Sequence, residues 1–273
     1  DERATAMGIK QTGVPAGGVV AAALAPSLVL VIGWRGALAA LGIVNFLFGF
    51  IFASLWRDPS DDKQDPSTAE TVFTEKNPLD IWRLLPLGCA TGIYLIGQMV
   101  LLTYVPLYLR DVMDFSPHWA SQALALTQAG AMVGRTGWGF MSDRIFGGRR
   151  KIVLIWIGVM SVVLIAALSV LERGSSDYLL LAILFFAGVS IVGYQGVSYA
   201  LIGEISGKAR TGAGLGMMIT INSGAATLGT PVFGHIVDRT GSYALGWQIL
   251  AALLTAGIIA LALLLKEPPP HSA

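Results

Sequence analysis

One arginine lies within a run of residues that is apolar enough to cross a membrane. Arg135 precedes the pair Asp143 and Arg144 by eight positions, which places it about 12 Å further along the same helix. A charge at that depth is costly and must face a bundle interior or a wet cavity. Because an arginine fork pairs bidentately with a carboxylate or a nitrate-like anion, we predict that Arg135 binds the negative charge of a solute. The alternative is a structural arginine that reaches back to Asp143 or to the membrane interface.

Lys10 is the second candidate for contact with an anion. It follows Arg3 by seven residues, in a run that also contains Pro15, and it would supply a second contact or a field that attracts the anion inward. The more ordinary interpretation is a lysine whose charge snorkels to the interface. Six further polar side chains within apolar runs are candidates to line a cavity, or to form hydrogen bonds between helices. They are Tyr94, Gln98, Gln128, Tyr194, Ser198 and Asn222.

The sequence lacks the motifs of several common enzyme classes. It contains no His-Glu-x-x-His, no Gly-x-Ser-x-Gly and no phosphate-binding Gly-x-x-x-x-Gly-Lys-Ser/Thr. The sequence therefore lacks the residues that a metalloprotease, a serine hydrolase or an ATP-driven pump would need. The three histidines are scattered, and no basic patch with interleaved aromatic residues suggests a nucleic acid. We therefore predict a protein that is not an enzyme, with no metal, no cofactor and no nucleic-acid partner.

The elements that hold these residues are expected to be membrane-spanning helices. Of the 273 residues, 54% are hydrophobic and 13% are charged, whereas an ordinary soluble domain has about a quarter charged residues. The apolar residues come in runs of about twenty, the length of a helix that crosses a bilayer. We predict an all-α membrane protein, a polytopic bundle of about eight transmembrane helices. The predicted spans cover residues 9–32, 36–56, 84–108, 119–141, 152–171, 178–202, 212–236 and 244–265.

Basic residues are distributed unevenly over the predicted loops. With eight alternating spans, fourteen of the 18 lysines and arginines fall on one side of the membrane and four on the other. Because lysine and arginine are retained on the cytoplasmic side, we expect both ends of this chain to be cytoplasmic and the protein to be a multi-pass protein of the cell membrane. One connection, residues 57–83, is long, acidic and proline-containing. It is interpreted as a solvated linker, with a partner-binding segment as the alternative.

The most specific pattern begins at Gly139, from which the chain reads Gly-Phe-Met-Ser-Asp-Arg-Ile-Phe-Gly-Gly-Arg-Arg. This segment resembles the Gly-x-x-x-Asp-Arg-x-x-Gly-Arg-Arg signature of the major facilitator superfamily. Spacing, residue types and the predicted side of the loop all agree. The alternative is an ordinary positive loop with a chance Asp-Arg pair. The signature residues are Gly139, Asp143, Arg144, Gly148, Arg149 and Arg150.

Each signature residue has an expected place. A glycine at 139 allows two helices to approach closely, and a glycine turn that includes residue 148 lets Arg149 and Arg150 face the cytoplasm. Asp143 and Arg144 are expected at the membrane face. There they should form a charge cluster with Glu204, near the cytoplasmic end of the sixth span, which holds the inner face closed in one state and separates in the other.

The resemblance implies a division of the whole chain. Members of this superfamily consist of two six-helix halves joined by a long cytoplasmic loop. Residues 1–56 would then be the last two helices of the N-terminal half and 57–83 the central loop; residues 84–266 would be the complete C-terminal half and 267–273 a cytoplasmic tail. Four helices would precede this chain, and the protein would act as a monomer together with them.

The resemblance also implies a function. Such carriers bind a solute between the halves and alternate access by rocking them, and in the nitrate/nitrite and monocarboxylate branches an arginine at the spacing of Arg135 contacts the anionic substrate. We predict a secondary active transporter of a small organic or inorganic anion, embedded in the lipid bilayer. The alternatives are a carrier of a neutral or cationic solute, such as a sugar or an exported drug, and a membrane scaffold or sensor that transports nothing.

Overall fold

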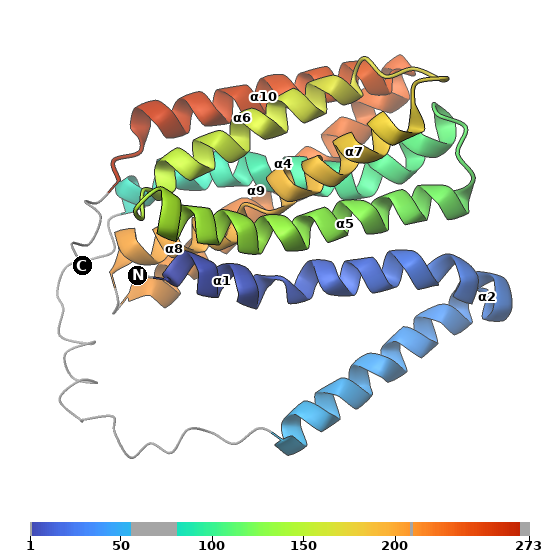
Figure 1. Ribbon diagram of the computed structural model, residues 1–273, viewed down its shortest axis with the longest axis horizontal. Helices are drawn as coiled ribbons and strands as arrows, with labels where there is room; N and C mark the ends of the chain where they lie inside the picture. Colours follow the sequence, from blue (N-terminus) through green and yellow to red (C-terminus); the bar gives the residue numbers. More distant parts are fainter. Residues whose placement is uncertain (1, 56–80, 208–209, 268–273) are drawn as a thin grey trace. The chain divides into compact units, whose positions relative to one another are not determined.

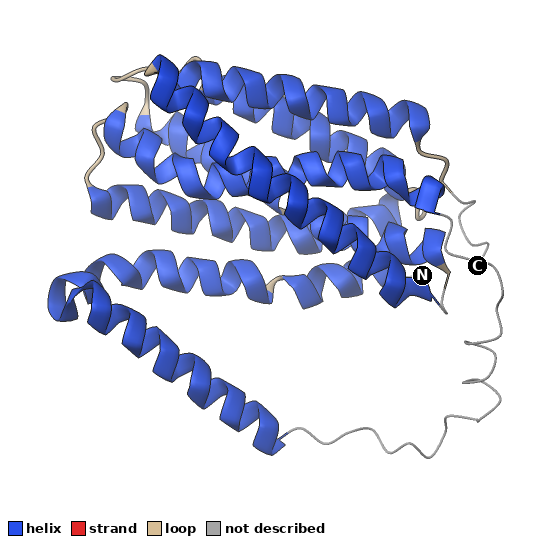
Figure 2. Ribbon diagram, turned by 180° about the vertical axis from the view of Figure 1, so that it is seen from behind, coloured by secondary structure: helices blue, strands red, loops and turns tan. Residues whose placement is uncertain are grey.

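The computed structural model describes residues 2–55, 81–207 and 210–267, and all regular elements in these ranges are helical (Figure 2). In chain order they are α1 (Arg3–Gln11), α2 (Gly13–Leu55), α4 (Ile81–Asp111), α5 (Pro117–Phe140), the π-helical turn η1 (Met141–Ile145), α6 (Arg150–Leu168), α7 (Asp177–Ala187), the π-helical turn η2 (Gly188–Val192), α8 (Gln195–Ser206), α9 (Thr211–Thr240) and α10 (Tyr243–Leu264). Residues 57–80 of the predicted linker 57–83 lie outside the described residues, and its last three residues belong to α4.

The all-helical membrane class predicted from the sequence is confirmed. Within the described residues, five helical segments are long and apolar enough to span a bilayer, by length and composition. The first of them covers residues 3–55 and contains the non-helical Gly33 (φ 69°, ψ 167°), so it supplies the two predicted spans 9–32 and 36–56. Helices α5 and α9 are 24 and 30 residues long but are rich in glycine, serine and threonine. Because of this lower apolar content, α5 and α9 are not among the five segments. Together with the two spans in the first segment, they account for the eight predicted spans.

Local sequence sets several helix ends. Helix α5 begins with Pro117 at its first position, and the Ser116 hydroxyl accepts a hydrogen bond from the Trp119 N–H at 3.4 Å, which satisfies one of the free N–H groups of the first turn. Ser242 caps α10 in the same way through the Leu245 N–H at 3.2 Å. Gly241 ends α9 in the left-handed conformation with φ 65°, where a residue without Cβ has no steric cost.

The chain divides into two compact units, one of residues 1–23 with 79–273 and the other of residues 24–78. In the first unit, α4 packs against α9 and α10, α10 packs against α6, and α5 packs against α7 and η2. Buried leucines, isoleucines and valines fill the space between these helices, together with Trp247, which stacks against Phe233 and Tyr108. Figure 1 shows these helices running side by side, so that the connections gather at two ends.

We name the two ends of this unit by their residues. The signature end carries the starts of α1 and α6 and the ends of η1, α8 and α10. The opposite end carries the ends of α4 and α6 and the starts of α5, α7 and α10 (Figure 1).

In the second unit, the described residues 24–55 continue α2, and large apolar side chains such as Phe46 and Phe48 are exposed. An exposed apolar surface of this kind suits contact with lipid or with further helices.

Candidate functional site

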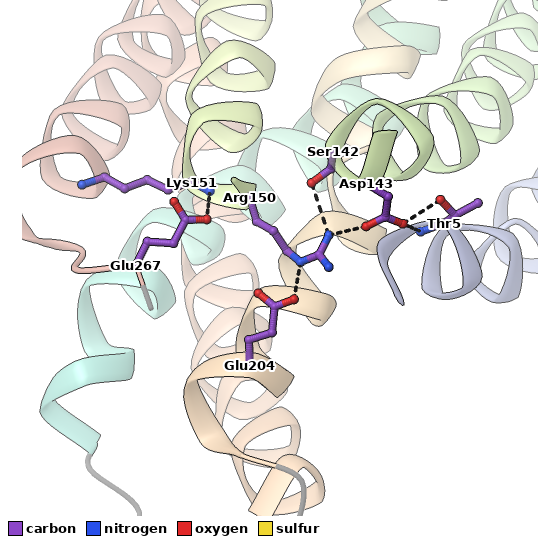
Figure 3. Close-up of polar contacts among 7 residues, drawn as sticks. All are labelled: Thr5, Ser142, Asp143, Arg150, Lys151, Glu204 and Glu267. Carbon is purple, nitrogen blue, oxygen red and sulfur yellow. Dashed lines mark hydrogen bonds and ion pairs between the residues drawn. The ribbon is translucent and has the colours of Figure 1, made fainter. Parts of the chain in front are cut away.

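The signature end holds a buried cluster of charges centred on Arg150. The Nη1 atom of Arg150 lies 2.8 Å from Oδ1 of Asp143, and its Nε lies 2.6 Å from Oε1 of Glu204. The side chains of Arg150 and Asp143 are each 1% exposed. Ser142 accepts a third, longer hydrogen bond from the same guanidinium at 3.3 Å. Figure 3 shows Arg150 lying between the two carboxylates.

Three segments bring these charges together. Asp143 lies in η1, which continues α5 as a π-helical turn, and Glu204 lies in the last turn of α8. Gly147 and Gly148 then adopt φ angles of 57° and 81°, in the left-handed region where glycine has no steric cost. They reverse the chain so that Arg150 becomes the first residue of α6. A buried arginine with a carboxylate on either side has the paired and hydrogen-bonded geometry that a buried charge requires.

Asp143 also holds the beginning of α1. Its Oδ2 atom accepts hydrogen bonds from the backbone N–H of Thr5 at 2.8 Å and from the Thr5 hydroxyl at 2.7 Å. Thr5 lies in the first turn of α1, where N–H groups have no partner within the helix, and a negative charge at this end complements the helix dipole. Burial alone would raise the pKa of the Asp143 carboxyl, but the hydrogen bonds from Arg150 and Thr5 outweigh burial and hold that pKa below its usual value.

Glycines set the distance between α1 and its neighbours α5 and α8. A Cβ atom on Gly139 would lie 2.5 Å from the carbonyl oxygen of Ala4, and one on Gly8 would lie 2.1 Å from the carbonyl oxygen of Arg135. On α8, a Cβ atom on Gly196 would lie 2.7 Å from the Cα atom of Gly8. Helix α1 is therefore in backbone contact with both α5 and α8, and any side chain at these positions would push it away.

Two expectations for the signature arginines were wrong. Arg150 does not face the cytoplasm, because it is buried between two carboxylates. Arg144, which was expected in the cluster with Asp143 and Glu204, instead pairs with Glu2 at an exposed position. The physical reason is that neighbouring residues of a helical turn point in different directions, so Arg144 does not share the direction of Asp143, and the turn at Gly147 and Gly148 brings Arg150 to Asp143 instead. Arg149 is exposed, and Gly148 forms the turn.

Arg135 is 1% exposed on α5 and is surrounded by backbone carbonyls. Its Nε donates to the carbonyl oxygen of Val192 at 3.3 Å, and its Nη1 donates to that of Gln11 at 2.5 Å. Within the described residues it makes no ion pair, and it does not reach back to Asp143, whose oxygens are occupied by Arg150 and Thr5. The result is a buried cation held by neutral acceptors.

The structure separates the other candidates for solute contact. Lys10 is exposed on α1. Gln128 lies against Gly18 of α2: a Cβ atom on that glycine would lie 2.1 Å from the Gln128 Nε2. The Oε1 atom of Gln128 is buried and has no hydrogen-bond partner among the described residues.

The two tyrosines lie inside the bundle. Tyr94 and Tyr194 are each 1% exposed and stack edge to face with 5.3 Å between ring centroids. Their hydroxyls donate to the carbonyl oxygens of Leu154 and Thr91, at 3.0 Å and 3.3 Å. Asn222 accepts a hydrogen bond from the Thr91 hydroxyl at 3.1 Å. These contacts match the alternative interpretation, in which the polar groups join helices.

The remaining two candidates are also buried. The Oε1 atom of Gln98 accepts a long hydrogen bond from Gln195 at 3.5 Å, and the Ser198 hydroxyl is fully buried with no partner in the described part of the chain.

A cavity of about 270 Å³ lies between α4, α9 and α10. Its lining, which includes Ile96, Leu228 and Phe233, is apolar and contains none of the residues predicted to contact a solute.

Several residues of the site were missed from the sequence. Thr5 is 138 positions from its partner Asp143, and no local pattern links them. Trp138, whose Nε1 donates to the Val189 carbonyl at 2.8 Å, follows Arg135 by three residues, so helical spacing was a usable signal. Glu267 accepts a hydrogen bond from the Lys151 N–H at 3.0 Å (Figure 3), and the sequence predicted that it lies in the cytoplasmic tail.

Comparison with known proteins defines the class. A family model described as Major Facilitator Superfamily matches residues 1–147 and 87–273, and the chain belongs to this superfamily. It is 30% identical to the probable sulfoacetate transporter SauU of Cupriavidus necator, over 95% of this chain and 64% of that protein. It is 27% identical to monocarboxylate transporter 13 of Rattus norvegicus, over 93% of this chain and 58% of that protein.

A solved structure shows the same fold. The crystal structure of the major facilitator transporter FucP in the outward conformation matches with a TM-score of 0.65 at 15% identity, covering 96% of this chain and 68% of that one. The chain therefore spans about two thirds of that structure, and 64% and 58% of the two curated relatives. The prediction that the chain belongs to the major facilitator superfamily, made from the signature residues, is confirmed.

Proposed function

We propose that the protein is a secondary active carrier that moves a small organic or inorganic anion across the cell membrane by alternating access. The observation that carries this proposal is Arg135, a buried cation that makes no ion pair within the described residues. A buried arginine is costly unless it is paired with an anion, and a solute carboxylate or sulfonate would supply that pairing. The names of the relatives, a sulfoacetate and a monocarboxylate transporter, support an anionic solute.

The signature end would be the gate of this carrier, and we place it on the cytoplasmic side. In this conformation α1 is packed on α5 and α8, and its first turn is held by Asp143. The cluster of Asp143, Arg150 and Glu204 spans η1, α6 and α8. A cluster that forms in one state and separates in the other biases a two-state carrier by a few kcal/mol. Residues 1–56 and 84–266 would belong to opposite halves, as the signature implied.

A second candidate function is the transport of a neutral solute. It is favoured by the two hydrogen bonds from Arg135 to backbone carbonyls, which give the guanidinium a structural role. In that case Arg135 would stabilise the fold without touching the solute. The FucP resemblance supports the fold alone and does not decide between the two.

The test is the binding of anionic probes to the purified full-length protein in liposomes. Sulfoacetate and lactate serve as probes, and Arg135→Lys is compared with Arg173→Lys, the same change at an exposed pair with Asp114. Lysine keeps the charge but cannot bind a carboxylate bidentately. We expect Arg135→Lys to weaken affinity about tenfold or more, the loss of one charge-assisted hydrogen bond, and Arg173→Lys to leave it unchanged. Equal affinities at matched folded concentration would favour the neutral-solute function.

A further inference from the structure

The interruption between α1 and α2 has an identifiable cause in the sequence. In a continuous helix the carbonyl of Gln11 would accept a hydrogen bond from the N–H of residue 15. Residue 15 is a proline, and proline has no N–H to donate. The break in the helix falls after Gln11, while the Thr12 carbonyl regains its normal partner, the Ala16 N–H, at 3.0 Å. Pro15 therefore leaves one carbonyl, that of Gln11, without a helical donor.

Arg135 supplies the missing donor from another helix. Its Nη1 points to the Gln11 carbonyl, and its Nε to the Val192 carbonyl. The second acceptor also lies at a break, because Val192 ends η2 before α8 begins. One guanidinium thus joins the two places where α1–α2 and η2–α8 depart from regular helix. Of its five N–H donors, two are used in these bonds.

Helix α1 is consequently held at both ends by one helix and its extension. Asp143 accepts from Thr5 at the start of α1, and Arg135, eight residues earlier, donates to Gln11 at its end. A carboxylate at the start and a guanidinium at the end both complement the dipole of α1. The negative charge thus lies at the positive end of the α1 dipole and the positive charge at its negative end. If the two charged residues were exchanged, both would oppose the dipole.

We propose that the bond from Arg135 to the Gln11 carbonyl is a latch on α1, created by Pro15, which an anionic solute must open. This inference rests on the proposed function for its solute part, because it assumes that the anion binds Arg135. In the latched state the guanidinium is 1% exposed, so a solute cannot reach its remaining N–H donors unless the backbone that covers Arg135 moves away. Anion binding and the latched α1 therefore compete, and occupancy of the site favours release of the gate helix.

The experiment measures hydrogen exchange of the α1 amides by mass spectrometry in the full-length protein, with and without sulfoacetate or lactate. In Pro15→Ala, the restored N–H competes with Arg135 for the Gln11 carbonyl. We expect α1 to exchange about tenfold faster than in wild type without solute, near the lower value of one hydrogen bond from a charged donor, and anion affinity to rise. In wild type, the anion alone should accelerate exchange of α1.

A matched control is Pro26→Ala, which removes the other proline within α2, eleven residues further along the chain. It should change neither α1 exchange nor anion affinity. Arg135→Gln provides a second way to open the latch if Pro15→Ala does not fold, and it should also accelerate α1 exchange. Unchanged exchange in whichever of these variants folds would overturn the latch.

The two proposals fail in different ways. If Arg135→Lys loses anion affinity but the anion does not change α1 exchange in wild type, the anion site stands and the latch is wrong. If Pro15→Ala accelerates exchange while neither probe binds more weakly to Arg135→Lys, the bond to Gln11 holds α1 but the anion competition is wrong. Only faster exchange in Pro15→Ala together with anion-driven exchange in wild type supports the whole inference.

Discussion

At the signature end Arg150 and Asp143 pair through side chains that are 1% exposed, whereas at the opposite end Arg173 and Asp114 pair through side chains that are 73% and 68% exposed. The buried pair is tied to a second carboxylate, Glu204, and through Asp143 to the start of α1. Exposed pairs contribute little because water and salt screen them. The same residue types therefore do different work at the two ends, and only the buried cluster joins four helical segments.

The comparison also concerns how closely helices approach. At the signature end three glycines, Gly8, Gly139 and Gly196, leave no room for a Cβ atom between α1 and its neighbours. At the opposite end, α4 and α10 are linked by a side-chain contact, in which the Tyr243 hydroxyl donates to Asp111 at 3.0 Å. Backbone contact has few intermediate positions, since packed interfaces switch between discrete arrangements. Such discrete behaviour is what the proposed gate at the signature end requires.

The largest effect is expected from removing the central cation. Arg150→Gln leaves Asp143 and Glu204 as buried carboxylates without a counter-charge, and breaking a buried ion pair on one side costs roughly 3–5 kcal/mol. Arg173→Gln, the same change at the opposite end, should have no measurable effect because that pair is exposed. Denaturant unfolding of the purified protein in detergent measures both. Equal losses of unfolding free energy would remove the distinction between the two ends.

The sequence predicted most of the fold because membrane helices are long and apolar. Most of the described helices begin or end within a few residues of a predicted span, as in α10, predicted at 244–265 and found at Tyr243–Leu264. The family followed from the signature around Asp143, whose spacing is local and therefore visible in one sequence. The division into halves that the signature implies stays a prediction.

The site was predicted less well, for reasons that lie in the geometry. The exchange of Arg144 for Arg150 in the cluster depends on the chain reversal at Gly147 and Gly148, which helical periodicity does not anticipate. The bond between Asp143 and Thr5 joins residues 138 positions apart. The carbonyl that Arg135 binds was, by contrast, readable in principle, because Pro15 leaves the acceptor four residues before it unpaired. Only the donor had to come from the structure.

An intermediate effect is expected from a matched pair of glycines on α5. In Gly139→Ala the new methyl group would lie 2.5 Å from a backbone oxygen of α1, whereas in Gly137→Ala it would meet nothing within 4 Å. Forcing an extra carbon into close packing costs roughly 1–3 kcal/mol, while alanine in place of an unhindered helical glycine gains up to about 1 kcal/mol. Relative to wild type, we expect the unfolding free energy to fall in Gly139→Ala and to rise in Gly137→Ala. Hydrogen exchange of α1 should become faster in Gly139→Ala alone.

The same sign for both alanine variants would show that α1 does not depend on close approach at residue 139. Such a result would weaken the view that backbone contact distinguishes the signature end, and the charges would then have to carry that distinction alone.

The smallest effect is expected at Glu267, where the signature end meets the end of α10. Burial raises the pKa of the Glu267 carboxyl, and nearby Glu204 adds to this, although hydrogen bonds from the backbone of Lys151 and Arg150 oppose it. Between the usual glutamate pKa and this raised value, the folded protein binds more protons than the unfolded chain. The unfolding free energy attributable to Glu267 therefore falls as the pH rises through that window. Asp143, with its lowered pKa, acts below the usual carboxyl range and in the opposite direction.

Glu267→Gln isolates this contribution because the amide oxygen still accepts from the Lys151 N–H while the titrating charge is lost. Lys151 itself donates from Nζ to the carbonyls of Ala262 and Leu265 at 2.8 Å and 2.6 Å, so the junction between α6 and α10 should persist in the variant. We expect thermal unfolding of Glu267→Gln to depend less on pH above the usual glutamate pKa, and the wild type to lose stability there. If the unfolding temperature of both proteins has the same dependence on pH, the protonation of Glu267 is not coupled to folding. The buried charges that affect stability at the signature end would then be those of the cluster around Arg150.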